Sequence, residues 1–115
     1  MHVVRLADAP PYQAPGHHDV GCLRLMGLEA GGSQGHWVGL SYYLPGSTVD
    51  MGAGPTEKTY IVLEGELTVI LADGAEHVLG PLDSCCIAAG EERAAENRTH
   101  RVTTILVVMP TPPAS

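Results

Sequence analysis

Short apolar runs separated by turn residues dominate the chain from about residue 23 onward. Apolar, β-branched and aromatic content predicts strands at 23–28, 37–44, 60–63, 66–71, 75–79, 84–88, 94–96 and 102–109. Asp73-Gly74 stands between two of these runs, which is a strong hairpin signal. Pro45-Gly46 is expected to end the 37–44 strand. The pattern predicts an all-β protein, a sandwich or barrel of short strands.

The first 22 residues differ from this pattern. Residues 7–21 are rich in Pro, Gly, His and Asp and show no period of 2 or 3.6. We therefore expect residues 1–22 to form an irregular N-terminal arm lying across a barrel core at 36–109. Residues 110–115 are expected to form a tail, because proline cannot donate to a sheet. The length of 115 residues indicates a single domain, 1–115.

Composition narrows the setting of the protein. A formal net charge of -7 argues against a nucleic-acid surface, and no apolar run approaches the roughly 20 residues of a membrane span. The N-terminus lacks the apolar stretch of a signal peptide, so we expect a cytoplasmic protein. Cys22, Cys85 and Cys86 are expected to be reduced thiols, because adjacent cysteines do not easily bridge each other.

Spacing between Gly46 and Asn97 resembles the two-motif signature of the cupin family. The first motif reads Gly, five residues, His-any-His, three residues, Glu, six residues, Gly. Its positions fall on Gly46, Gly52, Gly54, Lys58 and Gly65. The second reads Gly, five residues, Pro-any-Gly, two residues, His, three residues, Asn, and falls on Leu82, Ala88, Gly90, Arg93 and Asn97. The resemblance implies a double-stranded β-helix, the jelly-roll barrel of cupins.

The metal-ligand positions of that signature are replaced. Where cupins usually hold a divalent metal with three His and one Glu, this chain has Gly52, Gly54, Lys58 and Arg93. Lysine and arginine repel a cation, so we expect a site without a metal cofactor. Two cations in one cavity favour a small anionic metabolite as ligand. A metal site formed by His36, Asp50 and Glu57 is the alternative.

Lys58, the only lysine, is the first catalytic candidate. If its side chain points inward, desolvation and Arg93 should lower its pKa, so that it acts as a general base or forms a Schiff base. On the surface it would form a solvated pair with Glu57. Arg93 itself either binds the ligand or pairs with Glu57, Glu91 or Glu96 at the barrel mouth.

Further site candidates come from strand alternation. Of Tyr42 and Tyr43 one should face inward, and Tyr42 is the second catalytic candidate. Tyr60, His36 and Cys86 join Arg93 as expected ligand-binding residues. His17, His18 and Asp19 resemble a metal cluster only in composition and are expected to be exposed, as are His77 and His100.

The residues favour a small-molecule enzyme with non-redox chemistry, of the lyase, isomerase or decarboxylase kind. A ligand-binding or structural dimeric cupin is the second hypothesis, and a metal-dependent cupin with unusual ligands the third. A homodimer is expected because sheets of this size often bury an edge. A catalytic site predicts an open cavity where Lys58, Arg93 and a tyrosine converge, whereas a vestigial one predicts a cavity filled with aliphatic side chains.

Overall fold

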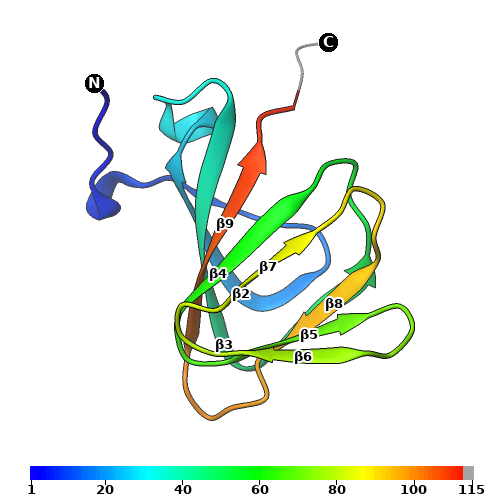
Figure 1. Ribbon diagram of the computed structural model, residues 1–115. Helices are drawn as coiled ribbons and strands as arrows, with labels where there is room; N and C mark the ends of the chain where they lie inside the picture. The colour runs from blue at the N-terminus through cyan, green and yellow to red at the C-terminus, as the bar shows by residue number, and fades with distance from the viewer. Residues whose placement is uncertain (113–115) are drawn as a thin grey trace.

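The chain forms one hydrogen-bonded sheet that curls into a nearly closed barrel (Figure 1). The structure is a computed structural model and describes residues 1–112. Its strands are β1 (Pro11–Tyr12), β2 (His17–Met26), β3 (His36–Gly52), β4 (Lys58–Glu64), β5 (Leu67–Leu71), β6 (Glu76–Leu79), β7 (Ser84–Ile87), β8 (Arg93–Glu96) and β9 (Thr103–Pro110). Two short 3₁₀ turns, η1 (Leu6–Asp8) and η2 (Leu28–Ala30), complete the elements. The all-β jelly-roll prediction is confirmed.

Strand β3 organises the sheet. The strand order is β6-β5-β8-β3-β9-β4-β7, with β2 also paired to β3 and β1 to β2. The first half of β3 pairs with β9 and the second half with β8, so one strand belongs to both walls of the barrel. The expectation that Pro45-Gly46 ends this strand is wrong. Both residues are exposed and pair with neither β8 nor β9, so they bend the strand without removing a hydrogen bond from those ladders.

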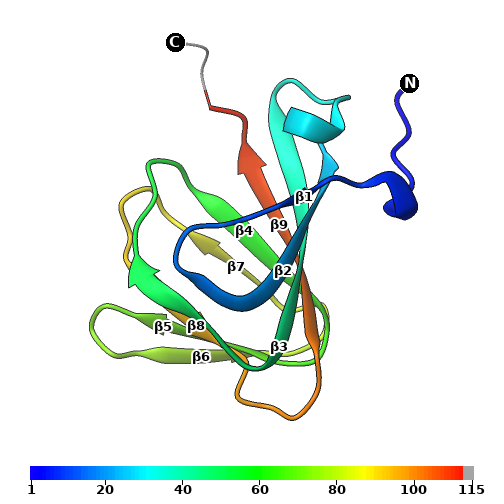
Figure 2. The ribbon, with the colours of Figure 1, turned by 180° about the vertical axis from the view of Figure 1, so that it is seen from behind.

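The N-terminal arm is less irregular than expected. Residues 17–22 belong to β2, which pairs with β3 from His17↔Val49 to Met26↔Val38. The segment between β1 and β2 crosses the open side of the barrel, as Figure 2 shows from behind. The hydrophobic pattern could not predict the strand at residues 17–22, because these residues are mostly not buried. Pairing with β3 makes them a strand. At the other end, β9 includes Pro110, one residue into the expected tail, and residues 113–115 of that tail lie outside the described part.

Aliphatic side chains between the walls form the core. Val62, Leu67, Ala95 and Ile105 are completely buried, and they come from β4, β5, β8 and β9. β4, β8 and β9 alternate buried and more exposed residues, as a barrel with one packed face requires, whereas the first three residues of β5 are all buried. Among residues 1–112, no helix has the length and apolar character needed to cross a membrane.

Two turns follow closely from their residues. The Asp73-Gly74 hairpin is confirmed: β5 and β6 are antiparallel, and Gly74 has a φ of 88°. Asp73 accepts a hydrogen bond from the Ala75 N–H at 2.9 Å. Gly65 ends β4 with a φ of 82°, and a Cβ there would lie 2.6 Å from Oγ1 of Thr103. The strand-turn-strand around Gly65 therefore requires glycine.

Leu82 occupies the first glycine position of the second cupin motif and adopts the conformation that glycine provides. Its φ is 67°, and its side chain is 79% exposed. A left-handed conformation costs a non-glycine residue about 1 kcal/mol, and little burial is lost with this side chain. We expect Leu82→Gly to stabilise the fold by about 1 kcal/mol and raise the melting temperature by about 4 °C. Thermal unfolding measures this, and an unchanged or lower melting temperature would contradict it.

Candidate functional site

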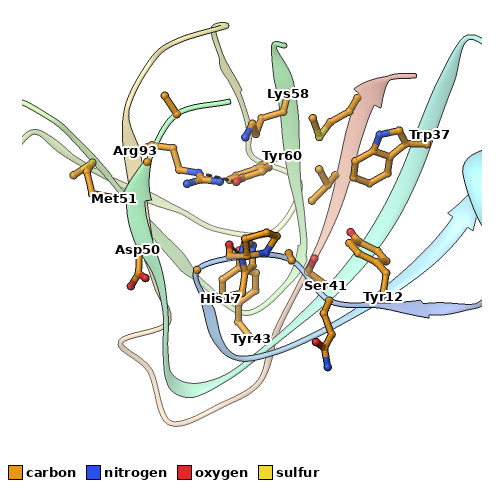
Figure 3. Close-up of a pocket in the computed structure, with 18 of the residues that line it drawn as sticks. Tyr12, His17, Trp37, Ser41, Tyr43, Asp50, Met51, Lys58, Tyr60 and Arg93 are labelled. Atoms are coloured by element: carbon orange, nitrogen blue, oxygen red, sulfur yellow. Dashed lines mark hydrogen bonds between the residues drawn. The ribbon is translucent and has the colours of Figure 1, made fainter. Parts of the chain in front are cut away.

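An open cavity of about 520 Å³ occupies the mouth of the barrel. Its walls come from the N-terminal arm, β2, β3, β4, β8 and β9 (Figure 3). The residues with polar or aromatic side chains in its lining are Tyr12, Gln13, His17, Arg24, Trp37, Ser41, Tyr43, Asp50, Lys58, Tyr60 and Arg93. The cavity is not filled with aliphatic side chains. Lys58, Tyr60 and Arg93 all line it.

Arg93 is a buried charge in the cavity. It is 8% exposed, and its Nε donates to the hydroxyl of Tyr60 at 2.9 Å. The ion pairs found within residues 1–112 do not include Arg93. The acidic residues considered as its partners are engaged elsewhere: Glu96 pairs with Arg98, and Glu91 accepts from the backbone N–H of Ala88. A buried cation without a counter-ion is unfavourable, so this guanidinium is suited to an anionic ligand.

Replaced metal-ligand positions surround the same space. Gly52 on β3 is the register partner of Arg93 on β8. Nζ of Lys58 lies 3.3 Å from the point where a Cβ of Gly54 would stand. A Cβ at Gly52 would meet only a backbone oxygen, at 4.0 Å. Gly52 therefore leaves its side-chain space open, whereas the ammonium of Lys58 lies against the space beside Gly54.

These four residues do not fit a divalent metal. Glycine offers no side-chain donor, and the ammonium and guanidinium groups are positively charged. Residues 1–112 contain no group of three or more His, Cys, Asp and Glu side chains arranged to hold a metal ion. The alternative metal site is not assembled: His36 is bonded to Ser33, Asp50 to His18, and Glu57 to Cys86.

Lys58 begins β4 and lines the cavity. Burial lowers the pKa of its ammonium below the usual 10.5, and the positive charge of Arg93 lowers it further. The same two causes were expected from the sequence. Glu57, its proposed surface partner, is instead within hydrogen-bonding distance of the thiol of Cys86, at 3.8 Å.

His17 is a cavity residue that the sequence did not single out. It lies at the start of β2, partly buried and in the cavity wall, and not exposed as expected. Nδ1 is 2.9 Å from the carbonyl oxygen of Pro15. A carbonyl only accepts, so Nδ1 carries the hydrogen and Nε2 is the free acceptor of the neutral ring. Burial lowers the pKa of His17, and the charges of Arg93 and Lys58 lower it further against the opposing effect of Pro15.

Three expected site residues lie away from the cavity. Tyr42 faces the opposite side of β3 from Tyr43, which is 1% exposed and lines the cavity. The choice of Tyr42 is therefore wrong, because the alternation of β3 turns Tyr43 inward. His36 is exposed at the start of β3, bonded to Ser33. Cys86 is exposed and borders a separate cavity of about 220 Å³ beside β7.

Aromatic rings form the other end of the cavity. The guanidinium of Arg24 lies 3.7 Å from the ring centroid of Tyr12 and 4.3 Å from that of Trp37. The two rings meet edge to face, with centroids 5.9 Å apart. Arg24 also pairs with Glu29 at 3.2 Å. Its charge is thus compensated, unlike that of Arg93.

Comparison with known proteins agrees with this architecture. Residues 39–109 match the family described as Cupin domain. This protein belongs to the cupin family. Over 114 residues the chain is 48% identical to Beta-D-galactosidase Rv1717 of Mycobacterium tuberculosis, covering 99% of this chain and 97% of that protein.

Solved structures show the same cupin fold. The polyketide cyclase RemF from Streptomyces resistomycificus superposes with a TM-score of 0.85 at 23% identity, covering 98% of this cupin and 82% of that chain. A sugar phosphate isomerase of the cupin superfamily from Silicibacter pomeroyi superposes with a TM-score of 0.78 at 26% identity, covering 96% and 76%.

Proposed function

We propose that this cupin is a non-redox enzyme, of the lyase or isomerase kind, acting on a small oxygenated anion. Arg93 and Lys58 hold the anionic group, and His17 exchanges a proton with the substrate. The observation that carries the proposal is the buried guanidinium of Arg93, which has no carboxylate partner among residues 1–112 and faces an open cavity.

The geometry supports a proton-transfer reaction. Nε2 of His17 would take a proton from a carbon next to a carbonyl, and the electron pair of the C–H bond would move onto the carbonyl oxygen. Arg93 and Lys58 would stabilise that oxygen through charged hydrogen bonds. Return of the proton to a different carbon completes an isomerisation, and departure of a leaving group completes an elimination. The phenol of Tyr60 keeps Arg93 in place, since it accepts from Nε.

The pH dependence follows from the pKa of His17, which lies below its usual 6.5. The base works only in its neutral form, so kcat/KM should be level near neutral pH and fall only as the pH drops through that lowered pKa. His17→Gln should abolish this fall of kcat/KM at acid pH, and it should lower the activity by at least about 100-fold. A fall of kcat/KM that occurs above pH 6.5, or an acid fall that is still present in His17→Gln, would contradict this role.

Lys58 could instead form a Schiff base with a carbonyl substrate, rather than act as a cation that binds the anionic group. Sodium borohydride added with a carbonyl substrate would reduce the imine and leave a stable mass increase on the chain's only lysine. We expect no such adduct if His17 is the base and Lys58 acts as a cation. An adduct on Lys58 would assign the chemistry to covalent catalysis.

Hydrolysis of β-D-galactosides is the second candidate, favoured by the 48% identical relative that bears this name. Glycosidases usually use two carboxyl groups that flank the scissile bond. Among residues 1–112, Asp50 is the one carboxylate that lines this cavity, and it is bonded to His18 at 3.0 Å. Hydrolysis in this cavity would therefore depend on Asp50.

Asp50→Asn separates the two candidates. If the protein hydrolyses galactosides, this variant should lose at least about 100-fold of its rate on 4-nitrophenyl β-D-galactoside. If the proposed proton transfer is right, Asp50→Asn should keep the activity on the anionic substrate within a few fold. If the wild type hydrolyses the galactoside, and if Asp50→Asn loses this activity while His17→Gln keeps it, the protein is a galactosidase and the proton-transfer proposal is wrong.

A reducing cytoplasmic setting and a homodimer remain part of the proposal. All three cysteines are free thiols, which fits a reducing compartment.

A further inference from the structure

We infer that the ligand of this cavity joins an anionic group to a ring, with the anion at Arg93 and Lys58 and the ring against Trp37 and Tyr12. This inference rests on the proposed function, since it takes the anion site as given. It adds the substrate class, an aryl or sugar ring bearing a phosphate or carboxylate.

Strand register places the two ends at a distance that suits such a molecule. Met109 on β9 is the partner of Trp37 on β3. On its other side, Val108 is the partner of Thr59, so the antiparallel ladder continues to Lys58 opposite Met109. Lys58, Met109 and Trp37 therefore form one row across three strands. Two strand spacings put the backbones at Lys58 and Trp37 about 10 Å apart across the sheet.

The two ends have opposite character. At one end Arg93 and Lys58 are cations without an acidic partner among residues 1–112. At the other, the charge of Arg24 is matched by Glu29 and covered by aromatic rings. Figure 3 shows Trp37 and Tyr12 on the opposite side of the cavity from Arg93. Val107 and Met109 make the wall between the two ends apolar. A ligand with one charged end and one flat apolar end matches this gradient.

Gly39 makes the aromatic end possible. It lies two residues after Trp37 on β3 and pairs with Val107. A Cβ at this position would stand 2.6 Å from the hydroxyl of Tyr12 and 3.0 Å from Cζ3 of Trp37. Any side chain here would displace the phenol or the indole. The absence of a side chain at Gly39 thus maintains the arrangement of the two rings. This observation does not depend on Arg93 or Lys58.

Cavity size also indicates more than a simple acid. A volume of about 520 Å³ lies within the usual range for ligands of drug size. A lone phosphate or carboxylate group would occupy only a small part of it. The aromatic residues Tyr12 and Trp37 line part of what remains.

Isothermal titration calorimetry with three phosphates tests the inference on the intact chain. Inorganic phosphate supplies the anion alone, phenyl phosphate adds an aryl ring, and D-galactose 6-phosphate adds a sugar ring. We expect at least one of the two ring-bearing phosphates to bind about 10-fold more tightly than inorganic phosphate. Whether the aryl or the sugar compound binds more tightly identifies the kind of ring.

Variants locate the ring. Tyr12→Ala should remove most of the advantage of the ring-bearing phosphate and leave the affinity for inorganic phosphate unchanged. Gly39→Ala should also reduce the advantage of the ring-bearing phosphate. It leaves Tyr12 in the chain, so it tests the ring site even if Tyr12→Ala destabilises the fold. Tyr42→Ala is the matched control, because this tyrosine points away from the cavity, and it should change neither affinity.

The possible failures are distinguishable. If neither ring-bearing phosphate binds more tightly than inorganic phosphate, or if Tyr12→Ala and Gly39→Ala both keep the full advantage, the ring site is wrong and the anion site stands. If none of the three phosphates binds, the proposed function fails and this inference fails with it.

Discussion

Replacement of Arg93 by methionine is expected to weaken anion binding by about 100-fold, or roughly 2.7 kcal/mol, while making the protein more stable. The affinity falls because the guanidinium is the buried group that can form two charged hydrogen bonds to a carboxylate or phosphate. Stability rises because a buried cation beside Lys58, with no carboxylate partner among the described residues, is unfavourable when no ligand is bound. Methionine fills a similar volume without the charge.

Anion titration and thermal unfolding measure these two effects on the same sample. We expect a stability gain on the order of 1 kcal/mol, since loss of the bond to Tyr60 offsets part of the relief. Arg98→Met is the matched control. It removes the same charge from an exposed residue that pairs with Glu76 and Glu96, and it should leave affinity unchanged. An Arg93→Met protein that is less stable and binds anions normally would show a structural role for this arginine.

Replacement of Asn97 by alanine is expected to destabilise the fold by about 3–4 kcal/mol. Asn97 is 1% exposed. Its Nδ2 donates to the carbonyls of Tyr43 at 2.9 Å and Arg101 at 2.7 Å, and its Oδ1 accepts from the N–H and hydroxyl of Thr99. Alanine would remove the amide donor from the Tyr43 carbonyl and would leave the Arg101 carbonyl with only the Thr99 hydroxyl. The bond to Tyr43 also fixes the part of β3 that lines the cavity.

Urea unfolding measures this effect. Thr99→Val is the matched comparison, because it removes only the hydroxyl part of the network and should cost about 1 kcal/mol. A loss below about 1 kcal/mol for Asn97→Ala would show that water replaces the amide.

Much of the fold is predictable because its turns carry local signals. Asp73-Gly74 and Gly65 mark turns through conformations that few other residues adopt, and the structure has both. Pro45-Gly46 carries the same kind of signal and misleads. A local motif cannot tell the end of a strand from a bend in a strand that pairs with β9 before the bend and β8 after it.

The site is predictable where family spacing fixes it and unpredictable where distant pairing does. Lys58 and Arg93 occupy motif positions, and both line the cavity. His17 reaches the cavity through the pairing of β2 with Val49, 32 residues later, which no local pattern shows. For Tyr42 and Tyr43, alternation offers two phases, and only the packing of β3 selects between them.

Lys58 and Arg93 line one cavity, and the proposed function places an anion between them. Lys58 is the only lysine, so ¹³C labelling of lysine gives a single side-chain resonance whose shift with pH reports its pKa. We expect a Lys58 pKa below 10.5 in the free protein, a partial rise of this pKa in Arg93→Met, and a rise in the wild type at saturating phosphate. A lysine that titrates at 10.5 under all three conditions would show that Lys58 does not share a desolvated cavity with Arg93 and an anion.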